Sequence, residues 1–254
     1  MSVFAYKIDC LTNLHVGSGD LNYNIIDNEV ERDAVTGYPV IHASGLKGAL
    51  REHYSKKKVS QQKILDVFGQ EPRSDEIKAG SYKFLDAYLL ARPMRVSGQL
   101  ASVMVVSEKS VNDFIRRMNT FGIKEFGSAY LSVKFPENVN FFSNVSGISV
   151  EAETTEPIPK SAMTVLEKLA GVIGNKIAIV KDFNEYDLPV IARNYLDNGE
   201  SKNLWYEEVV PHDSVFYTFI LTPDKEMELD LNEIIQIGGH ASIGCGFTKF
   251  TQLN

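Results

Sequence analysis

The chain has 254 residues, of which 44% are hydrophobic and 23% charged, and this ordinary globular composition excludes general disorder. Its 26 Lys and Arg residues stand against 33 Asp and Glu residues, a net charge of −7 that argues against a free-standing nucleic-acid binder. Two cysteines are too few for a disulfide framework, and no apolar run approaches the ~20 residues that span a bilayer, so the sequence predicts a cytoplasmic protein without membrane contact.

The first elements in chain order are a strand, a long loop and a helix. Residues 3–11 alternate between apolar and polar side chains, which predicts a half-buried strand. The loop over 15–43 carries three glycines and Pro39. Ser44 then predicts the N-cap of a helix that runs to about Lys57.

The middle of the chain mixes strands and helices. Residues 100–106 predict a strand, and apolar residues at i, i+3, i+4 and i+7 predict a helix from Ser107. Another helix is expected near Ser161. Asn198-Gly199 predicts a hairpin turn between two strands. The strands expected in this part of the chain are 176–182, 188–195, 203–209 and 215–221.

The C-terminal part predicts a short helix and a final strand. Asp230, with Glu233 three residues later, fits a capped helix that Gly238-Gly239 ends, and residues 242–251 fit the last strand. No linker, low-complexity tract or repeat divides the sequence, so we expect a single domain over residues 1–254. The mixture of elements predicts the α+β class.

A basic segment stands out against the acidic chain. Residues 197–233 hold ten acids and two bases, a net of −8, so the remainder sums to +1, and residues 42–58 hold five bases and one acid, a net of +4. On the expected helix, Ser44, Lys47, Arg51 and Lys58 fall within about 60° of one another. Free N–H groups at the helix start and this cationic face could bind a phosphodiester backbone, and a solvated helix face is the alternative.

A second candidate binding segment is glycine-rich. Residues 237–247 (IGGHASIGCGF) contain Gly238, Gly239, Gly244 and Gly246. Glycines let the backbone approach a ligand closely, and they also serve as plain turns. The segment lacks the Lys-Ser/Thr of a Walker A loop and is no dinucleotide fingerprint.

These segments belong to an ordered set of motifs. The set comprises residues 14–19 (LHVGSG), 36–41 (TGYPVI), 44–51 (SGLKGALR) and 238–247 (GGHASIGCGF), supported by 86–95, 188–194 and 203–208. In this order they resemble the RAMP superfamily of CRISPR-associated proteins, and within it the repeated backbone subunit of type III-B (Cmr) effector complexes. The chain departs from the family at Ala43, where a glycine is usual.

The resemblance implies a fold, partners and a biological role. The implied fold is a modified RRM (ferredoxin-like) palm with a β-hairpin thumb at about 183–206. The implied partners are guide (CRISPR) RNA, single-stranded target RNA, further copies of the chain stacked along the guide, and other type III subunits. The implied role is antiviral defence, with target RNA cut at regular intervals.

The resemblance also implies an active site. It places the catalytic aspartate at Asp27, which would hold a divalent metal such as Mg²⁺ or Mn²⁺ or orient a 2′-hydroxyl for attack on its own phosphate. The expected products are a 2′,3′-cyclic phosphate and a 5′-hydroxyl. His15 would lie near this site. Tyr206, Glu207 and Glu208 would contribute an aromatic or acidic group, and Arg193 would bind RNA.

Plainer readings of these residues stay open. Asp27 could be a loop acid that makes a turn, and a lone histidine such as His15 is more often structural. We expect Leu204 and Trp205 in a strand core. Two alternative functions remain: a non-catalytic guide-RNA scaffold of the same kind of complex, and a metal-independent guide-processing nuclease with His15 as general base.

Overall fold

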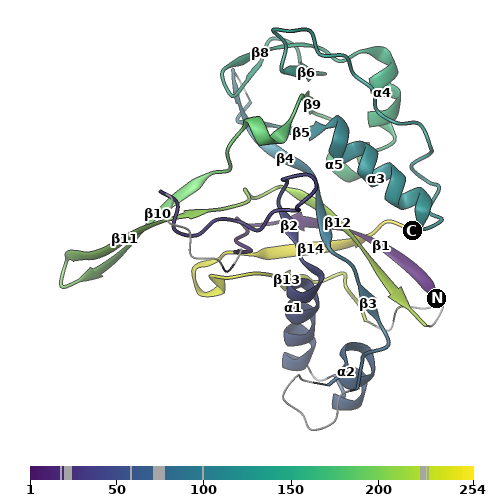
Figure 1. Ribbon diagram of the computed structural model, residues 1–254, viewed down its shortest axis with the longest axis vertical. Coiled ribbons are helices and arrows are strands. Elements are labelled where there is room, and N and C mark those ends of the chain that lie inside the picture. The colour runs from purple at the N-terminus through teal and green to yellow at the C-terminus, as the bar shows by residue number, and fades with distance from the viewer. Residues whose placement is uncertain are drawn as a thin grey trace. The chain divides into compact units, whose positions relative to one another are not determined.

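The structure is a computed structural model that describes residues 1–17, 19, 25–57, 59–70, 78–98, 100–223, 227 and 229–254 (Figure 1). The chain forms two compact units. The first comprises Met1–Tyr88, Leu188–His212 and Thr218–Leu253, and the second comprises Leu89–Asp187, Asp213–Tyr217 and Asn254. The expected α+β class is confirmed, and the expectation of a single domain stays a prediction. All the candidate site residues that the structure describes belong to the first unit.

The first unit combines a sheet with two helices. The helices are α1 (Ala43–Lys56) and α2 (Gln61–Phe68). The strands are β1 (Ser2–Cys10), β2 (Val40–Ile41), β3 (Lys83–Phe84), β10 (Val190–Asp197), β11 (Glu200–Glu208), β13 (Ile234–Gln236) and β14 (Phe247–Gln252), with parts of β4 (Ala87–Ser97) and β12 (Val215–Thr222). A 3₁₀ turn, η2 (Ala241–Ile243), precedes β14.

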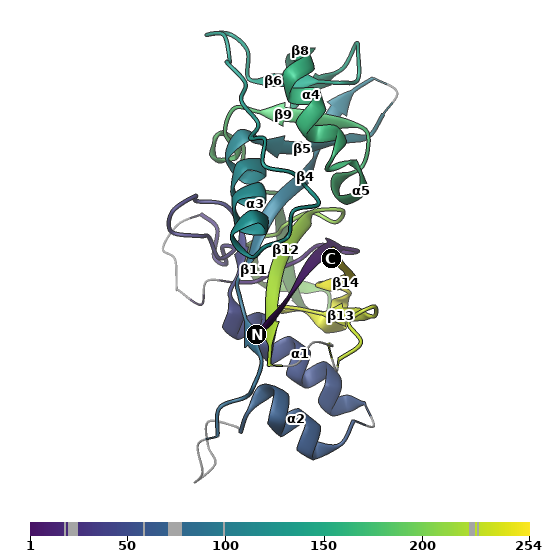
Figure 2. The same cartoon turned by 90° about the vertical axis from the view of Figure 1, so that its right-hand side faces the viewer.

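Alternation of apolar residues builds the core of this unit. β1 pairs antiparallel with β14, and Ile8 lies opposite Phe250, with both side chains fully buried. Helix α1 adds Leu46 and Leu50, four residues apart on one face and fully buried. It contacts α2, β3 and β13, as Figures 1 and 2 show. The helix therefore has one face in the core and leaves another for solvent or a ligand.

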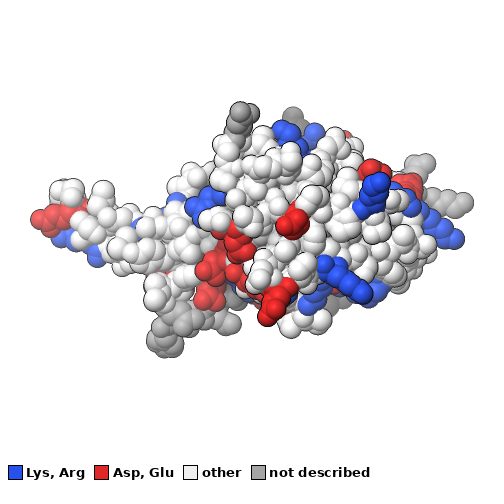
Figure 3. All heavy atoms as spheres, turned by 90° about the horizontal axis from the view of Figure 1, so that it is seen from above, with Lys and Arg blue, Asp and Glu red and all other residues white. Residues whose placement is uncertain are grey.

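Strands β10 and β11 form a separate antiparallel hairpin, which confirms the predicted turn. Asn198 and Gly199 both have positive φ, 51° and 83°, as a tight two-residue hairpin turn requires. Figure 1 shows the hairpin extending to the left of the other strands of its unit, and Figure 3 shows acidic and basic groups together at its end. There Lys202 pairs with Glu200 at 2.8 Å.

The hairpin exposes an unusual number of large apolar side chains. They are Val190, Tyr195, Leu196, Leu204 and Tyr206. The expectation that Leu204 lies in a strand core is therefore wrong, because a two-stranded ribbon has no second layer to cover it. Trp205 is only half-buried.

The second unit is also mixed. Its helices are α3 (Glu108–Thr120), α4 (Lys160–Glu167) and α5 (Ala170–Ile173), with the 3₁₀ turn η1 (Phe183–Glu185). Its strands are β5 (Ser102–Ser107), β6 (Phe141–Ser143), β7 (Ser149–Val150), β8 (Glu153–Pro157) and β9 (Ile177–Val180), with the rest of β4 and β12.

Helix α3 begins where its sequence predicts. Ser107 Oγ accepts from Ser110 N at 3.0 Å, and Ser110 Oγ accepts from Ser107 N at 3.1 Å. This reciprocal cap satisfies two backbone donors at the helix start. The predicted apolar stripe is fully buried, and it consists of Val111, Phe114, Ile115 and Met118. No helix in the described part of the chain is long and apolar enough to cross a membrane.

Three expectations about elements are wrong. Helix α1 begins at Ala43 with His42 as its N-cap, so Ser44 lies inside the first turn. Residues 230–233 are not helical, and β13 follows them directly; Asp230 instead accepts a hydrogen bond from Asn232 N at 3.0 Å. The last strand starts at Phe247, because the preceding residues form η2 and two left-handed glycine turns. Helix α2 was not expected at all.

Candidate active site at the base of the hairpin

Asp27 is attached to strand β11. Its Oδ2 accepts from Tyr206 N at 2.8 Å, and Asp27 N donates to Tyr206 O at 3.1 Å. The side chain is exposed, and its Oδ1 has no hydrogen-bond partner among the described residues. The structure therefore brings the predicted Asp27 next to the predicted Tyr206 across 179 positions of sequence.

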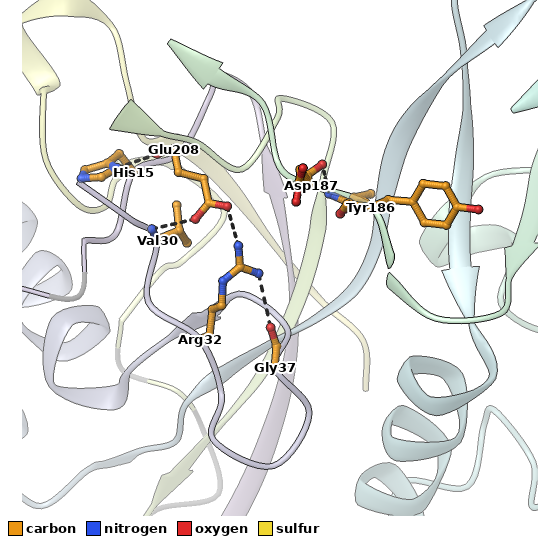
Figure 4. A network of polar contacts seen from close by, with 8 residues as sticks. His15, Val30, Arg32, Gly37, Tyr186, Asp187 and Glu208 are labelled. Atoms are coloured by element: carbon orange, nitrogen blue, oxygen red, sulfur yellow. Dashed lines mark hydrogen bonds and ion pairs between the residues drawn. The ribbon is translucent and has the colours of Figure 1, made fainter. Parts of the chain in front are cut away.

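Glu208 anchors the loop that carries Asp27. Its buried carboxylate accepts from Val30 N at 3.0 Å and pairs with Arg32, whose Nη1 donates to Gly37 O at 3.3 Å. Figure 4 shows Val30, Arg32 and His15 converging on this residue. His15 Nδ1 lies 2.8 Å from Glu208 O. Because a carbonyl only accepts, His15 carries its proton on Nδ1.

Glu207 belongs to a second buried group on the opposite face of the hairpin. Only 1% of it is exposed. Its carboxylate accepts from Arg193 Nε at 2.9 Å and Trp205 Nε1 at 2.7 Å, and His240 Nε2 lies 3.2 Å away. Burial alone would raise the pKa of Glu207, but the hydrogen bonds from Trp205 and Arg193 and the charge of His240 together lower it. Glu207 is thus a fixed anion rather than a proton carrier at neutral pH.

Arg193 belongs to the same buried group as Glu207. Its pKa is raised chiefly by the hydrogen bond to Glu207, and its Nη2 lies 3.8 Å from the sulfur of buried Cys245. These contacts give Arg193 an internal partner. Its predicted contact with RNA stays a prediction.

The glycine-rich segment packs against His15. Gly239 N donates to His15 O at 3.0 Å. A Cβ at Gly238 would lie 2.3 Å from His15 O, and one at Gly246 would lie 2.0 Å from Ile237 O. Both residues also have φ near +79°. Close backbone packing inside the protein therefore requires glycine at these two positions, while at Gly244 an added Cβ would meet open space.

The candidate RNA-binding residues of α1 have different environments. Ser44 is exposed, and Lys47 is half-buried without an ion pair to any described residue. Arg51 Nη1 donates to Gly69 O at 2.8 Å and so holds the end of α2. Lys58 lies outside the described residues. Among the described residues of this face, Lys47 is thus the cation without an internal partner.

The start of α1 already has an anion. Asp86 Oδ1 accepts from Ala43 N at 2.6 Å, and the imidazole of His42 lies 3.6 Å from the same oxygen and 3.3 Å from Glu31. A carboxylate at a helix N-terminus satisfies a free N–H and the helix dipole. An RNA phosphate would have to displace Asp86 to bind there.

The described residues do not fit a protein-built metal centre. No three His, Cys, Asp or Glu side chains among them converge to hold a metal ion. Asp27 offers one free carboxylate oxygen, whereas Glu207 and Glu208 are neutralised by arginines. We therefore assign no chemical step to a metal.

Sequence reasoning missed three residues of this region: Arg32 as the partner of Glu208, Asp86 as the cap of α1, and His240 as the partner of Glu207. A histidine inside a glycine-rich segment was the one local signal for the last of these. The other two depend on pairings over 176 and 43 positions, which no local pattern reports.

Comparisons with known proteins identify the family of the chain. A family model described as the RAMP superfamily matches residues 7–249. The CRISPR system Cmr endoribonuclease Cmr4 of Pyrococcus furiosus is 28% identical, over 99% of this chain and 96% of its own. The CRISPR system CMR subunit Cmr4 of Saccharolobus solfataricus is 25% identical, over 98% and 96%.

Solved structures share the fold. The chain resembles one in the cryo-EM structure of the type III-B Cmr-beta complex bound to cognate target RNA, with a TM-score of 0.75, 20% identity and coverage of 99% and 97%. It also resembles the crystal structure of oligomeric Cmr4 from Pyrococcus furiosus, with a TM-score of 0.71, 25% identity and coverage of 100% and 98%.

Proposed function

The chain belongs to the RAMP superfamily, as its ordered motifs predicted, and on that premise we propose that it is the repeated backbone subunit of a type III-B CRISPR ribonucleoprotein. It binds guide RNA and cleaves complementary target RNA. The Pyrococcus relative named as a Cmr endoribonuclease and the fold shared with a Cmr complex bound to target RNA support this proposal. The oligomeric relative supports stacking of several copies. The cytoplasmic location stays a prediction.

The observation that carries the proposal is the attachment of Asp27 to β11. One carboxylate oxygen is fixed by Tyr206 N at 2.8 Å, and the other has no hydrogen-bond partner in the part of the chain that the structure describes. A carboxylate held in this way can accept the proton of a ribose 2′-hydroxyl, whose oxygen then attacks the adjacent phosphate. The products are a 2′,3′-cyclic phosphate and a 5′-hydroxyl.

The hairpin β10–β11 is, in this proposal, the thumb. It projects from its unit and exposes apolar side chains such as Leu204 and Tyr206, which suits a wedge between stacked base pairs. The sheet of the first unit is the RRM-like palm, and Lys47 on α1 contacts the guide strand.

Replacing Asp27 tests the proposal. In a complex reconstituted with guide RNA, Asp27→Asn should bind target RNA as the wild type does but lose cleavage by about 10²–10⁴-fold, because the amide cannot accept the proton. Asp113→Asn, which breaks an exposed ion pair on α3, is the matched control. Undiminished cutting by Asp27→Asn would remove this residue from the mechanism. Parallel reactions with Mg²⁺, Mn²⁺ or EDTA test the predicted metal dependence.

A further inference from the structure

His240 lies in the glycine-rich motif, and the proposed mechanism gives it no role. Its Nε2 lies 3.2 Å from Glu207 Oε1, and 34% of its side chain is exposed. Its backbone is held in the left-handed region, with φ of 62° and ψ of 30°, at the start of η2. Its carbonyl oxygen accepts from Ile243 N at 3.1 Å and from Cys245 N at 3.2 Å, so the imidazole is carried by a hydrogen-bonded turn.

The two ring nitrogens of His240 differ in their partners. Nε2 faces a carboxylate and therefore carries a proton. Glu207 stays ionised because Arg193 and Trp205 also donate to it. Because Nε2 faces Glu207, Nδ1 is the ring nitrogen of His240 that is left for a ligand.

His15 lies behind His240. The ring centroids are 5.3 Å apart at an angle of 43°. His15 is only 7% exposed, and its Nδ1 proton is donated to Glu208 O. Of the two imidazoles, the one that solvent and RNA can reach is therefore His240.

Asp27 and His240 meet consecutive residues of β11. The carboxylate of Asp27 accepts from the N–H of Tyr206, and His240 lies against the side chain of Glu207. Asn28 also forms a parallel bridge with Glu207. Both groups are therefore held by adjacent residues of one strand, Asp27 through the backbone of Tyr206 and His240 through the side chain of Glu207.

We propose that His240 is the general acid of RNA cleavage, with Glu207 as its positioning residue. The inference rests on the proposed function. The 2′-hydroxyl gives its proton to Asp27 as the O2′–P bond forms, the P–O5′ bond breaks, and His240 Nδ1 gives its proton to the leaving 5′-oxygen. All atoms and charges balance without a further reactant.

A target RNA with sulfur in place of the leaving 5′-oxygen tests this assignment, because a thiolate leaves without protonation. We choose His240→Asn, since Asn tolerates the left-handed backbone. In the assembled complex, this variant should cleave normal target RNA about 10²–10⁴-fold more slowly than wild type but cleave the sulfur-substituted target at nearly the wild-type rate. Glu207→Gln should show a smaller defect that the sulfur also rescues. His212→Ala, an exposed histidine of the same unit, is the control.

Two results would overturn the inference while leaving the proposed function intact. One is wild-type cleavage of normal RNA by His240→Asn. The other is an equal loss on both targets, which would mean that His240 only supports the fold. If the wild-type complex cleaves neither target, the proposed function fails, and this inference fails with it.

Discussion

Glu208 ties three segments of the chain together. Its carboxylate binds Val30 and Arg32, and its carbonyl fixes the proton of His15. Because these contacts hold the loop on the C-terminal side of Asp27, they help to set the position of the Asp27 carboxylate. Glu208 itself is buried and paired, so it acts by positioning and not by proton transfer.

Glu208→Gln should therefore slow cleavage more than it weakens binding. The amide keeps the shape of the side chain but loses the charge that pairs with Arg32. A misplacement of about 1 Å can cost up to about 10²-fold in rate, so we expect a loss of this order with guide RNA binding unchanged. Single-turnover cleavage and RNA binding by the same preparation would measure both. An equal loss of binding would show that the residue only maintains the fold.

Glu207 gives the stability of the protein a defined pH dependence. Its pKa is lowered in the folded state, so its contribution is fully present above the pKa of the unfolded chain and is lost as pH falls toward the folded value. At neutral pH, Glu207→Gln should reduce the free energy of unfolding by up to about 3 kcal/mol, because it leaves Arg193 without its partner.

The difference between wild type and Glu207→Gln should shrink as pH falls below about 4.3, the ordinary pKa of glutamate, toward the lower pKa of the folded state. Urea unfolding at several pH values between 7 and 3 would measure it. A difference that stays constant over this range would mean that the ionised form of Glu207 contributes nothing.

The elements show which features local sequence determines. The start of α3 was predicted because its cap and its apolar stripe lie within twelve residues, and the hairpin turn was predicted because Asn-Gly suits positive φ. The start of α1 was misplaced because the anion that caps it, Asp86, comes from 43 positions away. The residues 230–233 carried a capping pattern with no apolar stripe behind it.

In the candidate site, too, some features follow from local sequence and others from residues that are distant in the chain. Asp27, Tyr206 and Glu207 were selected through family motifs, and the structure places them together at the base of the hairpin. Composition and spacing alone could not separate Glu207 from Glu208, although their side chains lie on opposite faces of β11 and have different partners. Successive side chains of a strand point to opposite faces, so the two glutamates can be assigned to different faces once the strand is known.

Replacement of Lys47 and replacement of Arg51, two cations of helix α1, should have different effects. Lys47→Ala should weaken guide RNA binding and reduce the salt dependence of that binding by about one phosphate contact, since Lys47 has no ion pair to a described residue. Arg51→Ala should instead lower thermal stability, because it removes a donor to Gly69 O.

RNA titrations at several salt concentrations and thermal unfolding of both variants would distinguish these roles. Lys109→Ala, on α3 in the second unit, is the control for a general loss of positive charge. If Arg51→Ala reduced the salt dependence without affecting stability, the assignments would be reversed.

Net charge limits how the whole chain can bind RNA. The chain carries −7, and Figure 3 shows acidic and basic groups interspersed on one face. One copy can therefore neutralise few phosphates, and strong binding requires several copies on one strand. The affinity for single-stranded RNA should rise cooperatively with RNA length, which gel mobility shifts over a series of lengths would measure. An affinity that does not change with length would contradict the stacking of copies.

The exposed hairpin has a consequence for the cell that makes this protein. A two-stranded ribbon that residues 27 and 28 pair with only at the base of β11, and that holds five large apolar side chains in water, is a template for unwanted pairing. Every copy that fails to find a place on a guide would present this ribbon to chaperones and proteases. Synthesis of the protein should therefore be matched to the supply of guide RNA, and surplus copies should be the first to aggregate or be degraded.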